Sequence, residues 1–190
     1  MTENQQSDLA WLGWIEVMRK VASFTQNGEF TTALSEIEAF LSRETRAELR
    51  SEALSLRADL KEQLGDLEAA KEDLLTARSL VGRSYMRYVQ ELSLGRLYRM
   101  QQRLNEAVSW YRVALHTCIE GEGISGGTAL KEFLTLRGQE ALTVEDQALT
   151  AQVAERSWRV LGLPGQPDLT SLPRVISAIK DGEANPPRKG

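Results

Sequence analysis

Two side chains with the chemistry of a nucleophile and its base stand close together in the sequence, Cys118 and His116. They are the chain's single cysteine and single histidine. On a helix, residues two apart point about 200° away from each other, so the imidazole does not reach the thiol. We therefore interpret both as ordinary packing residues near the end of a helix, and we expect no catalytic residues.

A second candidate for chemistry is the glycine-rich segment at residues 120–127, which reads Glu-Gly-Glu-Gly-Ile-Ser-Gly-Gly. A phosphate-binding loop would end in Gly-Lys-Ser/Thr and would follow a strand, and neither feature is present. The segment is predicted to be a flexible connector. One cysteine and one histidine also exclude an intramolecular disulfide and a structural zinc site, so we expect no metal and no cofactor.

The charge balance argues against two classes of partner. A net charge of −4 lacks the basic excess that dominates nucleic-acid affinity, so no nucleic-acid partner is expected. No apolar run approaches the ~18–20 residues that cross a bilayer, and residues 1–8 lack the basic flank of a secretory signal. We therefore expect no membrane partner and a cytoplasmic location.

Composition favours helices as the elements that position any functional side chain. Leucine and alanine far outnumber valine and isoleucine, and all five prolines lie after residue 163. Capping patterns at Thr45-Arg-Ala-Glu48 and Thr143-Val-Glu-Asp146 open two of the predicted helices. The predicted helices span about residues 8–26, 29–42, 45–64, 66–80, 84–101, 104–119, 128–137 and 143–161, followed by a last helix from about 168.

An internal repeat with a period of 37 residues is the strongest signal in the chain. Ala33, Ala70 and Ala107 fall in register, each five residues after a turn at Gly28, Gly65 or Gln102. The aligned apolar positions around them are Phe30, Leu67 and Leu104, and then Ile37, Leu74 and Tyr111.

This pattern is typical of antiparallel helix hairpins. A glycine reverses the chain, and the following alanine is small because it lies where the two helices cross at about 8–10 Å. Gln102 stands where the first two copies have glycine. A left-handed backbone at this glutamine would cost about 1 kcal/mol or more, so the third turn either bears that cost or takes another form.

The repeat resembles the tetratricopeptide repeat (TPR) family, most fully in Leu94-Gly95-x-x-Tyr98-(x)8-Ala107-(x)3-Tyr111-x-x-Ala114. The resemblance implies an all-α, right-handed solenoid of antiparallel hairpins in a single domain over residues 1–182. Its repeats would span about 14–47, 51–84 and 88–121, with a degenerate fourth hairpin at 125–161. A capping helix at 168–181 and a disordered tail at 183–190 would follow.

The resemblance also implies a concave groove, lined by the first helix of each hairpin, in which a protein or peptide partner binds. One end would be apolar with a single cation, the middle acidic and the far end cationic. A solvated surface joined by weak salt bridges is the alternative for the charged positions. Carried over by register, the groove residues are Ile15, Met18, Arg19, Ala22, Glu52, Ser55, Leu56, Asp59, Glu62, Val89, Leu92, Ser93, Arg96 and Arg99. No lysine–asparagine pair occupies them, so binding of a chaperone C-terminal tail is not expected.

The tryptophans near the N-terminus have two interpretations. Trp14 lies on the predicted buried face of the first helix, and Trp11 precedes it by three residues. Core packing is favoured for both, and exposure at an N-terminal dimer surface that includes Leu9, Leu12 and Ile15 is the alternative. A homodimer therefore stays open.

These observations favour a non-enzymatic adaptor that binds a protein or peptide. The alternative is a small acidic protector, either a toxin immunity protein or a secretion chaperone. An enzyme or a transcription regulator is kept only as the remaining class. Regulators often fuse such repeats to a DNA-binding or catalytic domain, and the predicted repeats leave no room for one.

Overall fold

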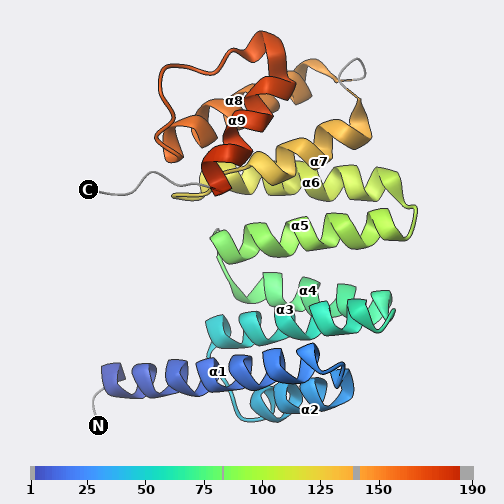
Figure 1. The fold of residues 1–190 in the computed structure, drawn as a ribbon, viewed down its shortest axis with the longest axis vertical. Helices are drawn as coiled ribbons and strands as arrows, with labels where there is room; N and C mark the ends of the chain where they lie inside the picture. Colours follow the sequence, from blue (N-terminus) through green and yellow to red (C-terminus); the bar gives the residue numbers. More distant parts are fainter. Residues whose placement is uncertain (1–2, 83, 139–141, 185–190) are drawn as a thin grey trace. The chain divides into compact units, whose positions relative to one another are not determined.

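The computed structural model of the 190-residue chain describes residues 3–82, 84–138 and 142–184 (Figure 1). Over those residues it contains nine α-helices, one short 3-10 turn at Leu169–Ser171 and no strand. The predicted all-α class is confirmed. The chain divides into two compact units, Met1–Gly82 and Arg83–Gly190, and its description as one domain stays a prediction.

Unit 1 consists of two helix hairpins. Its apolar core gathers Trp14, Val17 and Val21 from the first helix with Ile37 and Phe40 from the second. Consecutive helices pack against each other throughout the unit. The four helices are α1 (Glu3–Gln26), α2 (Phe30–Leu41), α3 (Ala47–Gln63) and α4 (Leu67–Leu80).

Unit 2 begins with a hairpin of the same type and ends with three helices that pack less regularly. The sixth helix contacts the fifth, seventh and eighth, and the ninth lies on the seventh and eighth. These helices are α5 (Tyr85–Met100), α6 (Leu104–Glu120), α7 (Gly127–Arg137), α8 (Val144–Val160) and α9 (Leu172–Ala184).

The register alanines occupy the predicted positions. Ala33, Ala70 and Ala107 are all fully buried, at 0% exposure. A methyl group is the largest side chain that lets two helices approach closely at such a crossing. The prediction that these three methyl groups lie between packed helices is confirmed.

One turn geometry recurs in both units. In each, the turn residue has a left-handed backbone, with φ of 77° at Gly28, 82° at Gly65 and 60° at Gln102. The next amide donates to the carbonyl five residues earlier, a Schellman motif. These bonds run from Glu29 to Phe24 at 2.8 Å, from Asp66 to Lys61 at 2.9 Å and from Arg103 to Tyr98 at 2.9 Å. Gln102 therefore takes the left-handed turn despite its Cβ.

One predicted cap is wrong and another is confirmed. The Thr45 hydroxyl does not cap α3; instead the carboxylate of Glu44 accepts hydrogen bonds from the amides of Thr45 and Arg46, at 3.0 and 2.9 Å. The glutamate reaches these amides because they lie one and two residues after it in the chain, just before α3 begins. At α8 the predicted capping box of Thr143 and Asp146 is present.

The glycine-rich connector is packed rather than flexible. Ile124 is buried at 1% exposure, and the amide of Gly126 donates to Ser157 Oγ at 2.9 Å. Ser125 Oγ donates to Glu183 Oε1 at 2.5 Å, and α9 continues to Ala184, two residues into the predicted tail. Residues 185–190 of that tail lie outside the described residues.

Candidate functional site

Helix α1 of unit 1 has apolar side chains on two sides. Its inward side is buried in the core, whereas an outward row with spacings of four, three and four residues stays exposed. We call this row the α1 stripe, and it consists of Trp11, Ile15, Met18 and Ala22. Trp11, Ile15 and Met18 are 40%, 52% and 37% exposed. The favoured prediction that Trp11 packs in the core is therefore wrong, because its side chain is 40% exposed whereas that of Trp14, three residues later, is 1% exposed.

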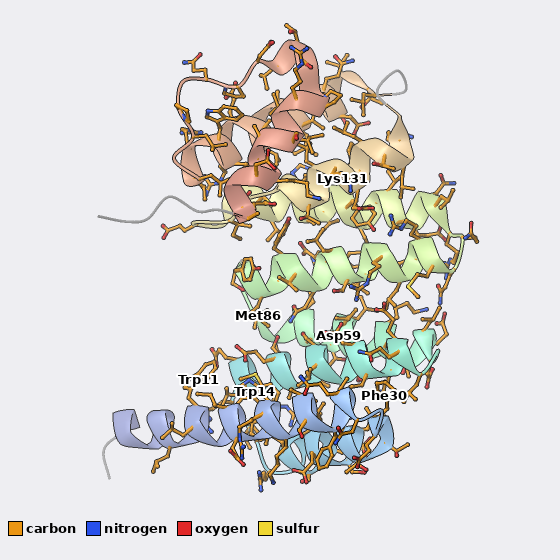
Figure 2. The ribbon with its side chains drawn as sticks, in the orientation of Figure 1. Trp11, Trp14, Phe30, Asp59, Met86 and Lys131 are labelled. Atoms are coloured by element: carbon orange, nitrogen blue, oxygen red, sulfur yellow. The ribbon has the colours of Figure 1, made fainter. Side chains whose placement is uncertain are left out.

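Trp14 links α1 to α3, the other first helix of unit 1. Its indole is 1% exposed and packs on Phe40 with ring centroids 4.9 Å apart. Figure 2 labels Trp14 on α1. Its Nε1–H donates to Glu52 Oε2 at 2.6 Å, so this groove-predicted carboxylate is engaged inside the unit. The bond fixes the two first helices against each other.

Among the other predicted groove residues of unit 1, Arg19 is engaged on its own helix. Arg19 pairs with Glu16 of its own helix at 2.8 Å, and both side chains are exposed. This arrangement agrees with the solvated-surface interpretation of Arg19. On α3, Asp59 is exposed, whereas Ser55, Leu56 and Glu62 are half-buried.

In unit 2, the five groove residues predicted on α5 line one cavity of about 250 Å³. We call it the α5 pocket. Residues 89, 92, 96 and 99 follow one another at helical spacing, so they share one face of α5. The pocket is lined by Val89, Leu92, Ser93, Arg96 and Arg99 of α5, Tyr111 of α6, and Thr128 and Glu132 of α7.

Tyr111 forms the buried wall of the α5 pocket because α5 has a glycine where the ring crosses it. A Cβ on Gly95 would lie 2.5 Å from Cε1 of the Tyr111 ring, so any other residue would displace the ring. Tyr111 is 1% exposed, and burial raises the pKa of its phenol. The hydroxyl therefore stays neutral and available for hydrogen bonding at physiological pH.

The charged groups of the α5 pocket carry a net positive charge. Arg99 Nη1 contacts Glu132 Oε2 at 2.5 Å, and Arg96 lies one turn before Arg99 on α5. The formal charges of the lining side chains, two guanidinium groups and one carboxylate, sum to +1 in a chain whose net charge is −4. The pocket is thus electrostatically suited to an anionic group.

Three pocket residues were not among the predicted groove positions. The repeat pattern predicts a large apolar residue at Tyr111, and this pattern does not indicate that its ring lines a pocket. Thr128 and Glu132 belong to α7, which follows the irregular segment 121–126 and has no fixed register with the preceding copies. Helical spacing within α7 aligns the two residues on one face, but only packing shows which face meets α5.

Another cavity in unit 2 is larger but has fewer ionic side chains in its lining. It measures about 410 Å³ and lies between α7 and α9, lined by Leu134, Pro173 and Ile176 among others. Lys131, labelled on α7 in Figure 2, is its one ionic side chain. The α5 pocket is smaller, yet it brings three ionic side chains together, and we take it as the candidate site.

Of the cysteine and the histidine, only Cys118 has the surroundings of a packing residue; the prediction of packing for His116 is wrong, because its side chain lies at the surface of α6. Cys118 is buried, and burial raises the pKa of its thiol to about 12, so it stays protonated. His116 is exposed. Within the described ranges no cluster of histidine, cysteine, aspartate or glutamate is arranged to hold a metal ion. In the same part of the chain no helix has the length and hydropathy to span a membrane.

Fold and site together define an all-α protein of antiparallel helix hairpins, with an exposed apolar stripe in one unit and a pocket lined by two arginines in the other. No protein-family model matches the sequence, and no curated protein matches it. Among solved structures the chain is similar to a kinesin light chain of Podosopora anserina with nearly identical TPR-like repeats. The two are 16% identical with a TM-score of 0.46, over 90% of this chain and 96% of the other.

Proposed function

We propose that the protein is a non-enzymatic interaction module that binds a protein or peptide partner through the outward side chains of the first helices of its hairpins. The observation that carries this proposal is the α5 pocket. Five residues chosen only by their register in the repeat converge on one cavity that combines apolar walls with arginines. Such a combination is typical of sites that orient a ligand by a few polar groups.

The volume of the pocket favours a macromolecular partner over a free metabolite. Small-molecule sites usually measure about 300–1,000 Å³. A cavity of about 250 Å³ holds one or two side chains of a partner that also contacts the surrounding helices. The α1 stripe supplies a second surface, because clusters of exposed large apolar residues commonly mark interaction sites.

Preorganisation is the proposed mechanism of affinity. The Trp14–Glu52 bond and the seat of Tyr111 on Gly95 hold the binding helices in place before a partner arrives. Little side-chain or backbone ordering then opposes binding. We also propose that the protein and its partner meet in the cytoplasm.

The test begins with affinity capture from native lysate, followed by calorimetry with each identified partner in recombinant form. Arg96→Gln and Arg99→Gln in the pocket, or Met18→Glu in the stripe, are expected to weaken binding at least about tenfold. Lys131→Gln is the matched control, since it removes one cation from α7 outside the α5 pocket. The proposal would be refuted if none of the three variants changed the affinity for any captured partner. It would also be refuted if the protein turned over a small molecule.

A protector of an aggregation-prone client is the second candidate, and the α1 stripe favours it. Affinity for an apolar client would change little with salt, because dispersion and desolvation dominate such a contact. Affinity for a basic toxin would fall steeply as salt is raised. Measuring each captured partner at low and high salt separates these two forms of protector.

A further inference from the structure

We propose that the α5 pocket recognises an aliphatic residue and an aspartate or glutamate two positions apart in an extended segment of the partner, and that Glu132 holds Arg99 until the partner's carboxylate arrives. This inference rests on the proposed interaction function. Beyond that function, it specifies the chemistry of the ligand and identifies a side chain of the protein that limits the affinity for this ligand.

The apolar and cationic parts of the pocket are separated along α5. Val89 and Leu92 lie in the first half of its pocket face, and Arg96 and Arg99 in the second. Residues 92 and 96 are about 6 Å apart along the axis, at 1.5 Å per residue. Two residues on the same side of an extended peptide are about 6.6 Å apart. An apolar-x-acidic sequence therefore matches the spacing.

Charge selects the acidic residue. The pocket's net charge of +1 attracts a carboxylate and repels a lysine or arginine, although the chain as a whole is acidic. The Ser93 and Thr128 hydroxyls on the lining supply further donors for its oxygens. Guanidinium–carboxylate bonds of this kind are among the strong, directional contacts in proteins.

Glu132 is the internal competitor. Its Oε2 lies 2.5 Å from Arg99 Nη1, where a partner's carboxylate oxygen would bind, and its side chain is 20% exposed. The guanidinium has five donors, so Arg99 can be shared, but both acids would then repel each other beside it. Replacing Glu132 with a neutral residue raises the formal charge of the pocket to +2 and removes this competition.

The experiment uses a phage-displayed library of random dodecapeptides, selected on the purified full-length protein. Enriched peptides are then synthesised with a fluorescent label, and their Kd is measured by anisotropy. We expect enrichment of the apolar-x-acidic pattern. Glu132→Gln should tighten these peptides by about tenfold, and Arg99→Gln should weaken them by at least as much, as expected for a charge-assisted bond.

Control variants keep the result specific. Glu132→Asp retains the carboxylate and is expected to stay close to wild type, whereas Lys131→Gln removes a charge from the same helix outside the pocket. Circular-dichroism melting checks that every variant is folded.

Each outcome decides the inference. Peptides without an acidic residue, or acidic peptides that Glu132→Gln leaves unchanged or weakens, would overturn it. Selected peptides that depend on Met18 but not on Arg96 or Arg99 would overturn it while leaving the interaction function intact. A library that yields no binder at all would count against both.

Discussion

Units 1 and 2 place opposite charges at the same positions of one repeat. Asp59 and Glu62 of α3 are 37 residues before Arg96 and Arg99 of α5, so an acidic pair in unit 1 corresponds to a basic pair in unit 2. The hairpin geometry around both pairs is the same, including the buried alanine and the left-handed turn. Repeat geometry therefore fixes where side chains project, and residue type alone decides what they bind.

The two units also differ beneath these positions. Ala58 and Leu74 of unit 1 correspond to Gly95 and Tyr111 of unit 2. In unit 1 the acidic side chain of Asp73 is held by Arg57 and Lys61, at 2.6 and 2.8 Å. Here two cations share one buried carboxylate, so the formal charges of the cluster also sum to +1, and both cations are bonded to Asp73. In unit 2 the glycine and tyrosine form a wall, and two arginines and one glutamate line the cavity beside it.

The largest expected effect comes from breaking the core of unit 1. Trp14→Ala removes an indole that is 1% exposed and leaves Glu52 without its donor, so we expect a loss of about 3–5 kcal/mol of unfolding free energy. Urea titration followed by circular dichroism measures it. Trp11→Ala is the matched control, with an expected change below about 1 kcal/mol because this ring is exposed. Equal losses for the two variants would contradict the assignment of their faces.

A smaller effect is expected at the tyrosine wall of unit 2. Gly95→Ala places a methyl group 2.5 Å from the Tyr111 ring, which should cost about 1–3 kcal/mol and weaken any ligand of the α5 pocket. Gly13→Ala meets no atom within 4 Å and should stabilise α1 by up to about 1 kcal/mol through helix propensity. Thermal unfolding of both variants gives the comparison. Stabilisation by Gly95→Ala would show that the ring is not held against the glycine.

Acid should weaken unit 1 through Glu44. The Arg46 guanidinium and the amides at the start of α3 lower the pKa of this carboxyl to about 2. The folded-state pKa lies below the unfolded value, so the stabilisation is complete above about pH 5 and is lost as pH falls from about 4.5 to 2. We expect the loss to be about 1–2 kcal/mol, discounted because Arg46 is partly exposed to solvent. Urea midpoints of wild type and Glu44→Gln should converge over this range, and parallel curves would contradict the prediction.

The smallest effect tests the turn that both units share. Gln102→Gly should stabilise the protein by about 0.5–1 kcal/mol, because glycine adopts a φ of 60° without the Cβ penalty. Gly65→Ala should cost about 1 kcal/mol, since alanine is strained at a φ of 82°. Melting temperatures of the two variants are expected to move in opposite directions. A shift of both in the same direction would mean that the backbone relaxes differently in the two turns.

Much of the fold was predictable because it follows from local rules. Helical spacing, the alanine register and the turn glycines each depend on nearby residues, and the structure agrees with them at Ala33, Ala70 and Ala107. The predicted cap at Thr45 is absent, and Glu44, which the capping pattern does not include, accepts from the Thr45 amide that Glu48 would bind in a capping box. Competition between neighbouring acceptors is settled by geometry that a short motif does not contain.

The candidate site was predictable in part. The α5 face of the pocket follows from register alone, and so does the charge difference from α3. Glu132 and Thr128 were missed because the packed segment 121–126 breaks the period before α7. Trp11 was misplaced because a helix with apolar residues on two sides does not reveal from its sequence which side faces the core.

The amino-acid sequence by itself determined that the chain forms antiparallel helix hairpins, where they reverse, and which residue types stand at the outward positions of each first helix. These properties depend on backbone preferences and on spacing of a few residues. Only the tertiary structure decided that Arg99 meets Glu132, that Tyr111 lies on Gly95 and that Trp14 rather than Trp11 is buried. Those contacts join residues from different helices, and their formation depends on how whole helices pack, which no local pattern encodes.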